Sequence, residues 1–271
     1  MKNLKYYISA LIITVAFTSC KKEGCTDPTA INYKKEAKKD DGSCQFENFS
    51  NGDMQFQIRW ANAYSPFEFG EDYSHSATGE NINFEKLNFY ISNVKLKKAD
   101  GTWWEENESY HLIKASAGNA NPSLTIKNIP NGEYTELAYL IGVDSTRNVS
   151  GAQEGALSVS ENMFWNWNSG YIFIKAEGTS TDSPNGNFSY HLGGFREDNN
   201  TNAIQEKTHA FGGSTIVIDK NSKADFKLLV NIARFWHGGI QIENIPMVHM
   251  PGQNAITFAT NFADGFILES Y

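Results

Sequence analysis

The apolar positions of this chain recur at every second residue over much of its length. From Met54 to Trp60, apolar and polar residues alternate, which is the period of a strand with one buried face. Turn signals such as Asp100-Gly101 and Pro130-Asn131-Gly132 separate such segments from one another. Other expected strands cover residues 84–96, 110–113, 124–126, 134–143, 171–176, 188–192, 215–218 and 226–232. Short strands between turns predict an all-β fold, an antiparallel β-sandwich over residues 50–271.

One late segment has a helical period instead. Between Ala255 and Phe266 an apolar residue recurs at every third or fourth position, and Asn254 stands where a side chain can cap a helix. The apolar positions are Ala255, Ile256, Phe258, Ala259, Phe262, Ala263 and Phe266. We expect a short C-terminal amphipathic helix that closes one end of the sandwich.

Residues 1–19 have the pattern of a secretion signal. Lys2 and Lys5 precede the apolar run Tyr6–Phe17, and small residues follow it. The run is shorter than the ~20 apolar residues that a spanning helix needs, which argues against a retained membrane anchor. The motif Thr18-Ser19-Cys20 resembles a lipobox, so we expect cleavage before Cys20 and lipidation of its thiol.

Acyl chains on Cys20 would tether the mature protein to a membrane. Each buried CH₂ group contributes ~0.8 kcal/mol to such binding. We therefore expect a lipid-anchored protein of the cell envelope, at the outer membrane, on either its periplasmic or its surface face. The membrane is thus the first expected partner.

The two remaining cysteines bracket a small polar module within residues 20–48. Cys25 and Cys44 form an even pair in an oxidising compartment, which predicts a disulfide. The segment has too few apolar residues to build a core, so this bond must hold it together. It resembles a GCTDP…NY…A…DDGSC module that is common in secreted bacterial surface proteins.

The aspartates of this module allow two interpretations. Asp27, Asp40 and Asp41 supply the carboxylate oxygens that calcium prefers. The alternative is that they are solvated turn residues on a disulfide-stapled spacer.

Charge and motif content narrow the classes of function. The formal net charge of −8 argues against nucleic acid as a partner, because phosphate binding depends on Lys and Arg. The chain has no Gly-x-Ser-x-Gly elbow, HExxH motif, Walker loop or paired Cys-His nucleophile. We therefore expect a protein that is not an enzyme.

Several stretches together resemble the MbnP-like domain, a group of extracytoplasmic copper-binding lipoproteins and their relatives. They match in order and spacing over roughly residues 50–268, and the tryptophan-rich one is the most distinctive. The stretches are Phe89–Leu96, Gly132–Tyr134, Ile141–Ser145, Met163–Tyr171, Lys175–Gly178 and Phe188–Gly194.

The resemblance implies a β-sandwich that binds copper outside the cytoplasm and is not itself an enzyme. In the family, histidines join a tryptophan that a diheme peroxidase-like partner oxidises to kynurenine. An outer-membrane transporter is a further partner that the resemblance suggests. The chain departs from the family pattern at Arg147-Asn148-Val149, where better-characterised members have a histidine.

His191 is the first expected copper ligand, because it lies in the His-Leu-Gly-Gly motif of this resemblance. If residues 188–192 form a strand, His191 and Ser189 share one face, and Tyr190 points to the other. A histidine that hydrogen-bonds backbone at a strand end is an interpretation of comparable weight.

His237 and His249 complete the expected ligand set. Glycines follow His237, and a surface histidine is the alternative there. Met247 and Met250 flank His249; thioethers favour copper(I), although methionines more often fill gaps in cores. The remaining histidines, His75, His111 and His209, lie in polar or short-strand contexts and are not selected.

Trp165 and Trp167 are the expected sites of oxidation. In an extended chain both indoles point the same way. A pair of core tryptophans is the alternative interpretation, and the adjacent Trp103 and Trp104 are alternative targets.

Two functions follow from these observations. The first is a membrane-anchored lipoprotein that binds metal, copper above all, for capture or hand-over. The second is a surface binding or adhesion module that recognises a glycan or a protein without metal.

Overall fold

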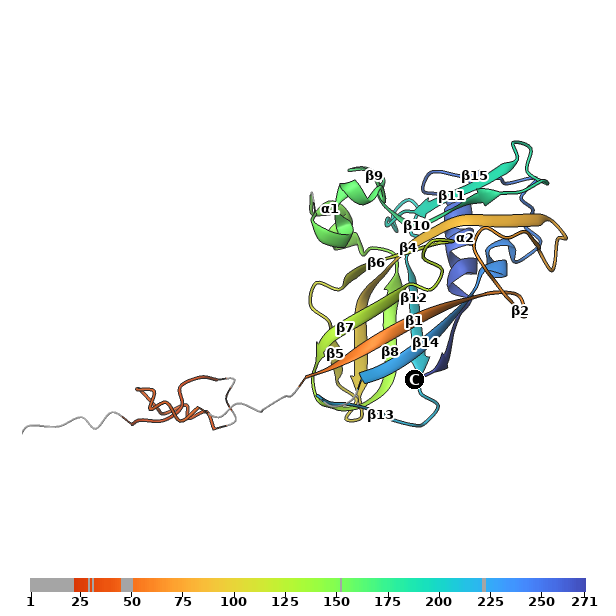
Figure 1. The fold of residues 1–271 in the computed structure, drawn as a ribbon. Coiled ribbons are helices and arrows are strands. Elements are labelled where there is room, and N and C mark those ends of the chain that lie inside the picture. Colours follow the sequence, from red (N-terminus) through yellow and green to blue (C-terminus); the bar gives the residue numbers. More distant parts are fainter. Residues whose placement is uncertain (1–21, 29, 31, 45–50, 152, 221–222) are drawn as a thin grey trace, which may run out of the picture. The chain divides into compact units, whose positions relative to one another are not determined.

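The computed structural model describes residues 22–271 except 29, 31, 45–50, 152 and 221–222 (Figure 1). The chain divides into two compact units, Met1–Phe49 and Ser50–Tyr271, and each is described by itself. The expected signal peptide and Cys20 lie outside the described residues, so cleavage and lipidation stay predictions. Within the described residues, no helix has both the length and the apolar character needed to cross a membrane.

The larger unit is an all-β sandwich, as the alternation predicts, and its smaller sheet is centred on β1 (Gly52–Asn62). β14 (Lys223–Asn231) and β7 (Ser123–Ile129) pair with β1 on either side. β16 (Phe266–Ser270) is added beyond β14, and β2 (Ser65–Pro66) pairs with the end of β1. Apolar residues of β1 alternate with half-buried polar ones, so one face of this sheet is directed into the core.

The larger sheet is organised around one long strand, β4. Its main path runs β12 (Gln205–Ala210), β8 (Gly132–Ile141), β4 (Asn81–Lys98), β10 (Gly170–Thr179), β11 (Asn187–Gly193) and β15 (Met247–Val248). Five short strands join this path: β13 (Ile216–Ile218) on β8, then β3 (Tyr73–Ser74), β5 (Trp103–Glu105) and β6 (Tyr110–Ser116) on β4, and β9 (Phe164–Asn166) on β10.

The sheets are antiparallel at most pairings, but two pairs differ from the expectation. β1 and β14 run parallel, with Phe56 opposite Phe226, and β11 and β15 also run parallel. β14 reaches β1 from β13, which belongs to the other sheet, so no hairpin turn fixes its direction. Among the strands that the structure describes, the antiparallel prediction is therefore wrong for these two pairs only.

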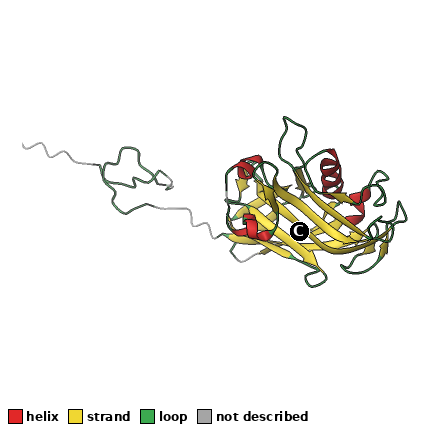
Figure 2. Ribbon diagram, turned by 90° about the horizontal axis from the view of Figure 1, so that it is seen from above, coloured by secondary structure: helices red, strands yellow, loops and turns green. Residues whose placement is uncertain are grey.

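The helices are few and short, and Figure 2 shows them at the margins of the sheets. They are α1 (Ser145–Val149), α2 (Gln253–Ala263) and the 3₁₀ helices η1 (Gly155–Leu157), η2 (Val159–Glu161) and η3 (Ile232–Trp236).

The C-terminal helix exists as expected, but its ends differ from the prediction. The N-cap is Gly252, so Asn254 lies inside the first turn and does not cap the helix. The helix ends at Ala263, and Phe266 begins β16. Gly265 makes this change possible, because a Cβ there would lie 2.6 Å from the carbonyl oxygen of Asn231 in β14. Apolar spacing alone could not separate the last helical residue from the first residue of the strand.

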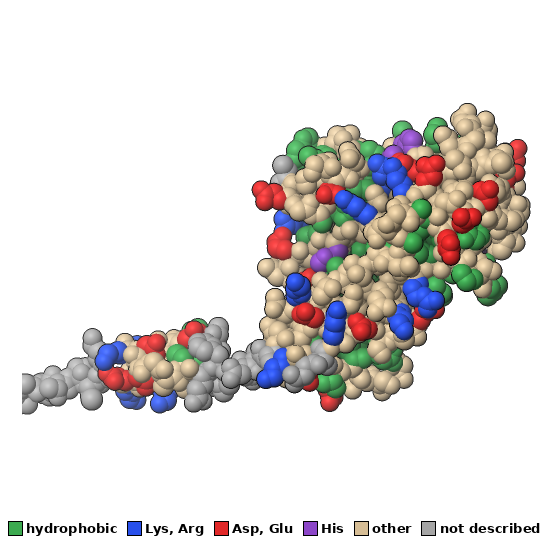
Figure 3. Space-filling model, in the orientation of Figure 1, with side chains coloured by type: hydrophobic (Ala, Val, Ile, Leu, Met, Phe, Trp, Pro, Cys, Tyr) green, Lys and Arg blue, Asp and Glu red, His purple; other side chains and the backbone are tan. Residues whose placement is uncertain are grey.

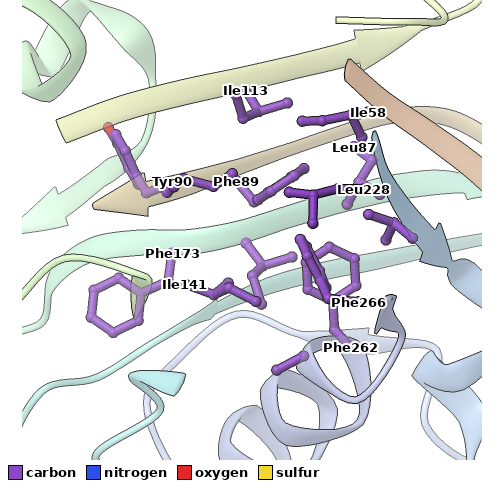
Figure 4. Close-up of a cluster of buried hydrophobic side chains, with 14 of the residues drawn as sticks. Ile58, Leu87, Phe89, Tyr90, Ile113, Ile141, Phe173, Leu228, Phe262 and Phe266 are labelled. Atoms are coloured by element: carbon purple, nitrogen blue, oxygen red, sulfur yellow. The ribbon is translucent and has the colours of Figure 1, made fainter. Parts of the chain in front are cut away.

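The core is rich in aromatic rings that meet edge to face. Phe89 of β4 contacts Phe262 of α2 at 5.4 Å and Phe266 of β16 at 5.6 Å between ring centroids. Figure 4 shows Phe89 among Leu228 and Ile141, so β4, β8, β14 and α2 all contribute to one cluster. Such aromatic contacts each add about 0.5–1.5 kcal/mol beyond the area they bury.

The small unit contains the expected disulfide between Cys25 and Cys44, whose Cα atoms are 4.7 Å apart. A bridge between Glu23 and Lys39 adds a backbone pairing, and their side chains form an ion pair of 2.6 Å. The expected calcium ligands Asp40 and Asp41 accept the backbone N–H groups of residues 42 and 43. These two carboxylates therefore have a turn role; calcium binding stays a prediction.

Candidate functional site

The expected metal ligand on β11, His191, lies on the outer face of the larger sheet. Phe188, Tyr190 and Leu192 are buried, while Ser189 and His191 are half-buried on the opposite face. The orientation that alternation predicts for His191 is thus present. β9, β10, β11 and β15 lie together in this region (Figure 1).

Strand register sets two rows of side chains on this outer face. In the first row, Glu177 of β10 stands opposite Ser189, which in turn stands opposite Met247 of β15. In the second row, Lys175 stands opposite His191. Paired residues point to the same side of a sheet, so these polar side chains are directed outward together.

His249 completes the second row by stacking on His191. The two ring centroids are 4.4 Å apart, and the ring planes meet at 26°. Ser189 contacts both rings: its Oγ lies 3.3 Å from Nε2 of His191 and 2.8 Å from Nε2 of His249. The structure therefore brings together two of the three expected ligands, from segments that are far apart in the sequence.

A carboxylate holds the His191 ring. Nε2 of His191 lies 2.6 Å from Oε1 of Glu177, and Lys86 Nζ lies 2.6 Å from the other oxygen of that carboxylate. A carboxylate only accepts, so Nε2 of His191 donates and the lone pair of the neutral ring resides on Nδ1. Among the described residues, no hydrogen bond engages Nδ1 of His191. Metal-binding histidines commonly have this arrangement, with one N–H held by a carboxylate.

The surroundings of this ring, its burial above all, oppose its protonation. Burial lowers the pKa of His191, as do the positive charges nearby, including Lys175, and these effects exceed the opposing hydrogen bond to Glu177. Burial raises the pKa of the Glu177 carboxyl, but hydrogen bonds from Lys86 and His191 outweigh it and hold this pKa below its usual range. His191 is therefore a neutral imidazole near pH 7, the form that binds metal.

His237 occupies a different environment. It is exposed at the C-terminal end of η3, where its Nδ1 lies 3.3 Å from Nη1 of Arg234. In the part of the chain that the structure describes, no hydrogen bond or ring contact joins it to His191 or His249. Within the described part of the chain, no group of three or more His, Cys, Asp or Glu side chains is placed to hold a metal ion.

The other three histidines each have a partner of their own. His75 is buried between Thr78 Oγ1 at 2.9 Å and the carbonyl of Ala233 at 3.0 Å. His111 lies 2.7 Å from a Glu106 oxygen. His209 contacts the Tyr139 hydroxyl, and burial together with a nearby Lys207 lowers its pKa to about 4.

The two candidate tryptophans do not point the same way, contrary to expectation. Asn166 Oδ1 accepts the backbone N–H groups of residues 168 and 169, both at 2.9 Å, and turns the chain after β9. Trp167, 57% exposed, consequently packs on Phe164. Trp165 packs against the outer face of Gly193, where a Cβ would meet its ring at 2.9 Å. Gly193 is two residues from His191, so the strand period directs this contact to the side of β11 that His191 faces. Trp165 is half-buried and also packs against the hydrophobic core.

The alternative tryptophans lie elsewhere on the larger sheet. Trp103 is 39% exposed, and Lys95 Nζ lies 5.3 Å from its ring centroid. Trp104 packs partly against the core. Trp103 is thus the exposed member of this pair.

The segment in which the chain departs from the family pattern has a structural role. Asn148 is buried in α1, where its Nδ2 donates to the carbonyl of Val143 and its Oδ1 accepts the N–H of Tyr171. Arg147 pairs with Glu108. Asn148 therefore fixes the start of β10, the strand that carries Lys175 and Glu177.

Sequence reasoning missed Ser189 as a shared contact and missed Glu177 and Lys86 altogether as parts of this site. Alternation along β10 places Lys175 and Glu177 on one face, which is a usable signal. The contribution of Lys86 depends on the register between β4 and β10, which alternation does not give.

Figure 3 shows a face of the larger unit on which acidic and basic side chains are interspersed. No field of a single sign covers that face.

Comparisons with known proteins give one solved structure and one family. Among solved structures, MbnP from Methylosinus trichosporium is similar, with a TM-score of 0.49 and 13% sequence identity, over 75% of this chain and 83% of that chain. No curated protein matches the sequence. The family model described as MbnP matches residues 51–251, well over half of the 271 residues. The chain therefore belongs to the MbnP family.

Proposed function

We propose that this extracytoplasmic protein binds copper at the His191–His249 pair and serves in copper capture or hand-over. The observation that carries the proposal is the stacked imidazole pair, 4.4 Å apart, with Glu177 holding the first ring by its N–H. Membership of the MbnP family supports the same conclusion independently of this geometry.

The donor set suits copper. Imidazole is a good ligand for copper, and affinity for copper(II) is the highest in the divalent series. A ring nitrogen's lone pair lies in the ring plane, so one ion bound by both rings requires the stack to open. His249 is the exposed member of the pair and follows the last residue of β15, so its ring has room to turn. The two residues therefore fit a copper ion with a small side-chain movement.

Trp165 is the residue that we propose for oxidation to a kynurenine-type ligand. Its contact with Gly193 is on the side of β11 that His191 faces, whereas Trp167 packs on Phe164. The proposed partner for this modification is a diheme peroxidase-like enzyme, and an outer-membrane transporter is proposed as a further partner. The protein itself is assigned no catalytic step.

The proposed location is the outer membrane, with lipid on Cys20 as the anchor. The supporting observations are the sequence signals in residues 1–20 and the family's extracytoplasmic location. Mass spectrometry of the native protein tests this part, because a diacylglyceryl group on an N-terminal Cys20 adds a defined lipid mass. Recovery of an unacylated chain that retains residues 1–19 would contradict it.

Copper titration of three alanine variants tests the metal site. We expect His191→Ala and His249→Ala each to lose high-affinity copper binding. His237→Ala is the matched control, because His237 is exposed and has no contact with the pair in the described residues. Equal binding by all three variants and the unaltered protein would refute the proposal.

The second candidate function is recognition of a glycan or protein without metal. The observation that favours it is the exposure of Trp167, at 57%, in the turn that follows β9. It predicts that a ligand protects Trp167 from fluorescence quenching and that the histidine variants bind this ligand normally.

A further inference from the structure

Two methionines beside the imidazole pair are exposed. Met247 is 50% exposed and Met250 is 70% exposed, whereas Met54 and Met163 are fully buried in the core. A methionine that fills a gap in a core loses its contact with water, so Met247 and Met250 do not have that role. Their thioethers are instead available to a ligand.

Strand register places Met247, and not Met250, on the histidine face. Met247 stands opposite Ser189 and Val248 opposite Tyr190 in the parallel pair of β11 and β15. Val248 is buried, so Met247 and His249 on either side of it are directed outward. Met250 lies beyond the end of β15 and has no partner strand among the described residues.

The side chain of Met247 can reach the imidazole pair. Neighbouring strands are about 4.8 Å apart, so the Cα atom of Met247 lies at about that distance from the Cα atom of Ser189. The Oγ atom of Ser189 contacts both imidazole rings. Methionine is unbranched and has three rotatable bonds, which lets its sulfur reach an ion held beside Ser189.

We propose that the thioether sulfur of Met247 is a third ligand at this site and makes it selective for copper(I). This inference rests on the proposed function, since His191 and His249 supply the other two ligands. A soft thioether favours copper(I), whereas zinc gains little from it. The nearby charges act in the same direction, because Lys86 and Lys175 flank Glu177 and their two ammonium groups disfavour a divalent cation more than a monovalent one.

Competition titrations on three proteins test the inference. The unaltered protein, Met247→Leu and Met250→Leu are titrated with copper(I) against a chromogenic chelator under reducing, oxygen-free conditions, and with zinc(II) separately. We expect Met247→Leu to weaken copper(I) binding by about tenfold or more, a loss typical of altered metal surroundings. Its zinc affinity should stay unchanged. Met250→Leu, the same substitution three residues away, should change neither affinity.

X-ray absorption at the copper edge gives a second readout. A sulfur scatterer should be present in the unaltered protein and in Met250→Leu, and absent in Met247→Leu. Leu replaces an exposed Met of similar volume, so all three proteins should unfold at the same temperature. Undiminished copper(I) affinity in Met247→Leu, or a sulfur signal that depends on Met250, would overturn the inference.

Two results distinguish a missing thioether ligand from a missing histidine site. If His191→Ala loses copper while Met247→Leu retains it, the copper site stands and the thioether ligand is refuted. If His191→Ala binds copper as well as the unaltered protein, the histidine site itself is refuted.

Discussion

Trp165 rests its indole directly on the backbone of Gly193, so closely that a Cβ at residue 193 would lie 2.9 Å from the ring. The same Cβ would lie 2.4 Å from the carbonyl oxygen of Tyr171 in the neighbouring strand. Only glycine therefore allows β11, β10 and the indole to approach one another here. Gly193 is two residues from His191, so the strand period directs this contact to the side of β11 that His191 faces.

Gly193→Ala is expected to separate Trp165 from the sheet and to weaken the metal site. The added methyl group meets a backbone oxygen that cannot move away freely, so the free energy of unfolding should fall by about 1–3 kcal/mol. Denaturant unfolding measures this change. Gly118→Ala is the matched control, because the nearest atom to its Cβ would be 4.0 Å away. Equal stability of the two variants would contradict the close contact.

Trp165 is expected to carry added oxygen in protein from the native host, and Trp167 is not. Its contact with Gly193, on the side of β11 that His191 faces, favours this residue, while Trp167 lies on Phe164. Fragmentation mass spectrometry distinguishes the two tryptophans within one peptide. Protein made in a host without a diheme peroxidase-like enzyme is the control and should show no added oxygen. Oxygen found on Trp167 alone would contradict the assignment.

The alternation of apolar and polar residues predicted which way His191 points. It did not predict which segments of the chain come together at the site. The outward direction of His191 followed from the strand period, because the orientation of neighbouring side chains is a property of one strand. The stacking of His249 on His191 could not be predicted in this way. It depends on the parallel pairing of β15, a strand of two residues, and so short a segment has no period to recognise.

The tryptophan pair shows how a side chain can override a backbone period. Extended chain would have placed Trp165 and Trp167 on one face, but Asn166 accepts two backbone N–H groups and forms a turn. Asn166 and the run Asn168-Ser169-Gly170 consist of residue types that favour turns. Given more weight than alternation, that signal would have separated the two indoles in advance.

Acid is expected to destabilise the larger unit through His209. Burial lowers the pKa of this imidazole to about 4 in the folded protein, so the unfolded chain, with an ordinary histidine pKa near 6.5, binds the proton more strongly. The stabilising contribution is complete above about pH 6.5 and is lost as the pH falls towards 4. The loss amounts to at most about 3 kcal/mol, since the side chain is partly exposed.

Urea unfolding between pH 4 and 7 checks this prediction by comparison with His209→Gln. The glutamine variant retains a polar group near the Tyr139 hydroxyl but has no proton to gain, so its stability should depend less steeply on pH. Parallel curves for the two proteins would show that His209 does not contribute.

Glu177→Ala is expected to weaken copper binding without removing a ligand. Glu177 holds Nε2 of His191 at 2.6 Å and so orients the ring, and partners of this kind are worth about 10–100-fold in metal affinity. Glu136→Ala is a closely matched control: Glu136 is 25% exposed against 24% for Glu177, and it pairs with Lys97 at 2.7 Å on the same sheet. Glu136→Ala leaves Lys97 without its carboxylate, and Glu177→Ala leaves Lys86 and Lys175 without theirs, so a general effect of lost ion pairs would lower copper affinity in both variants. A loss confined to Glu177→Ala would support a role for the His191 contact, because that hydrogen bond joins Glu177, and not Glu136, to a proposed ligand.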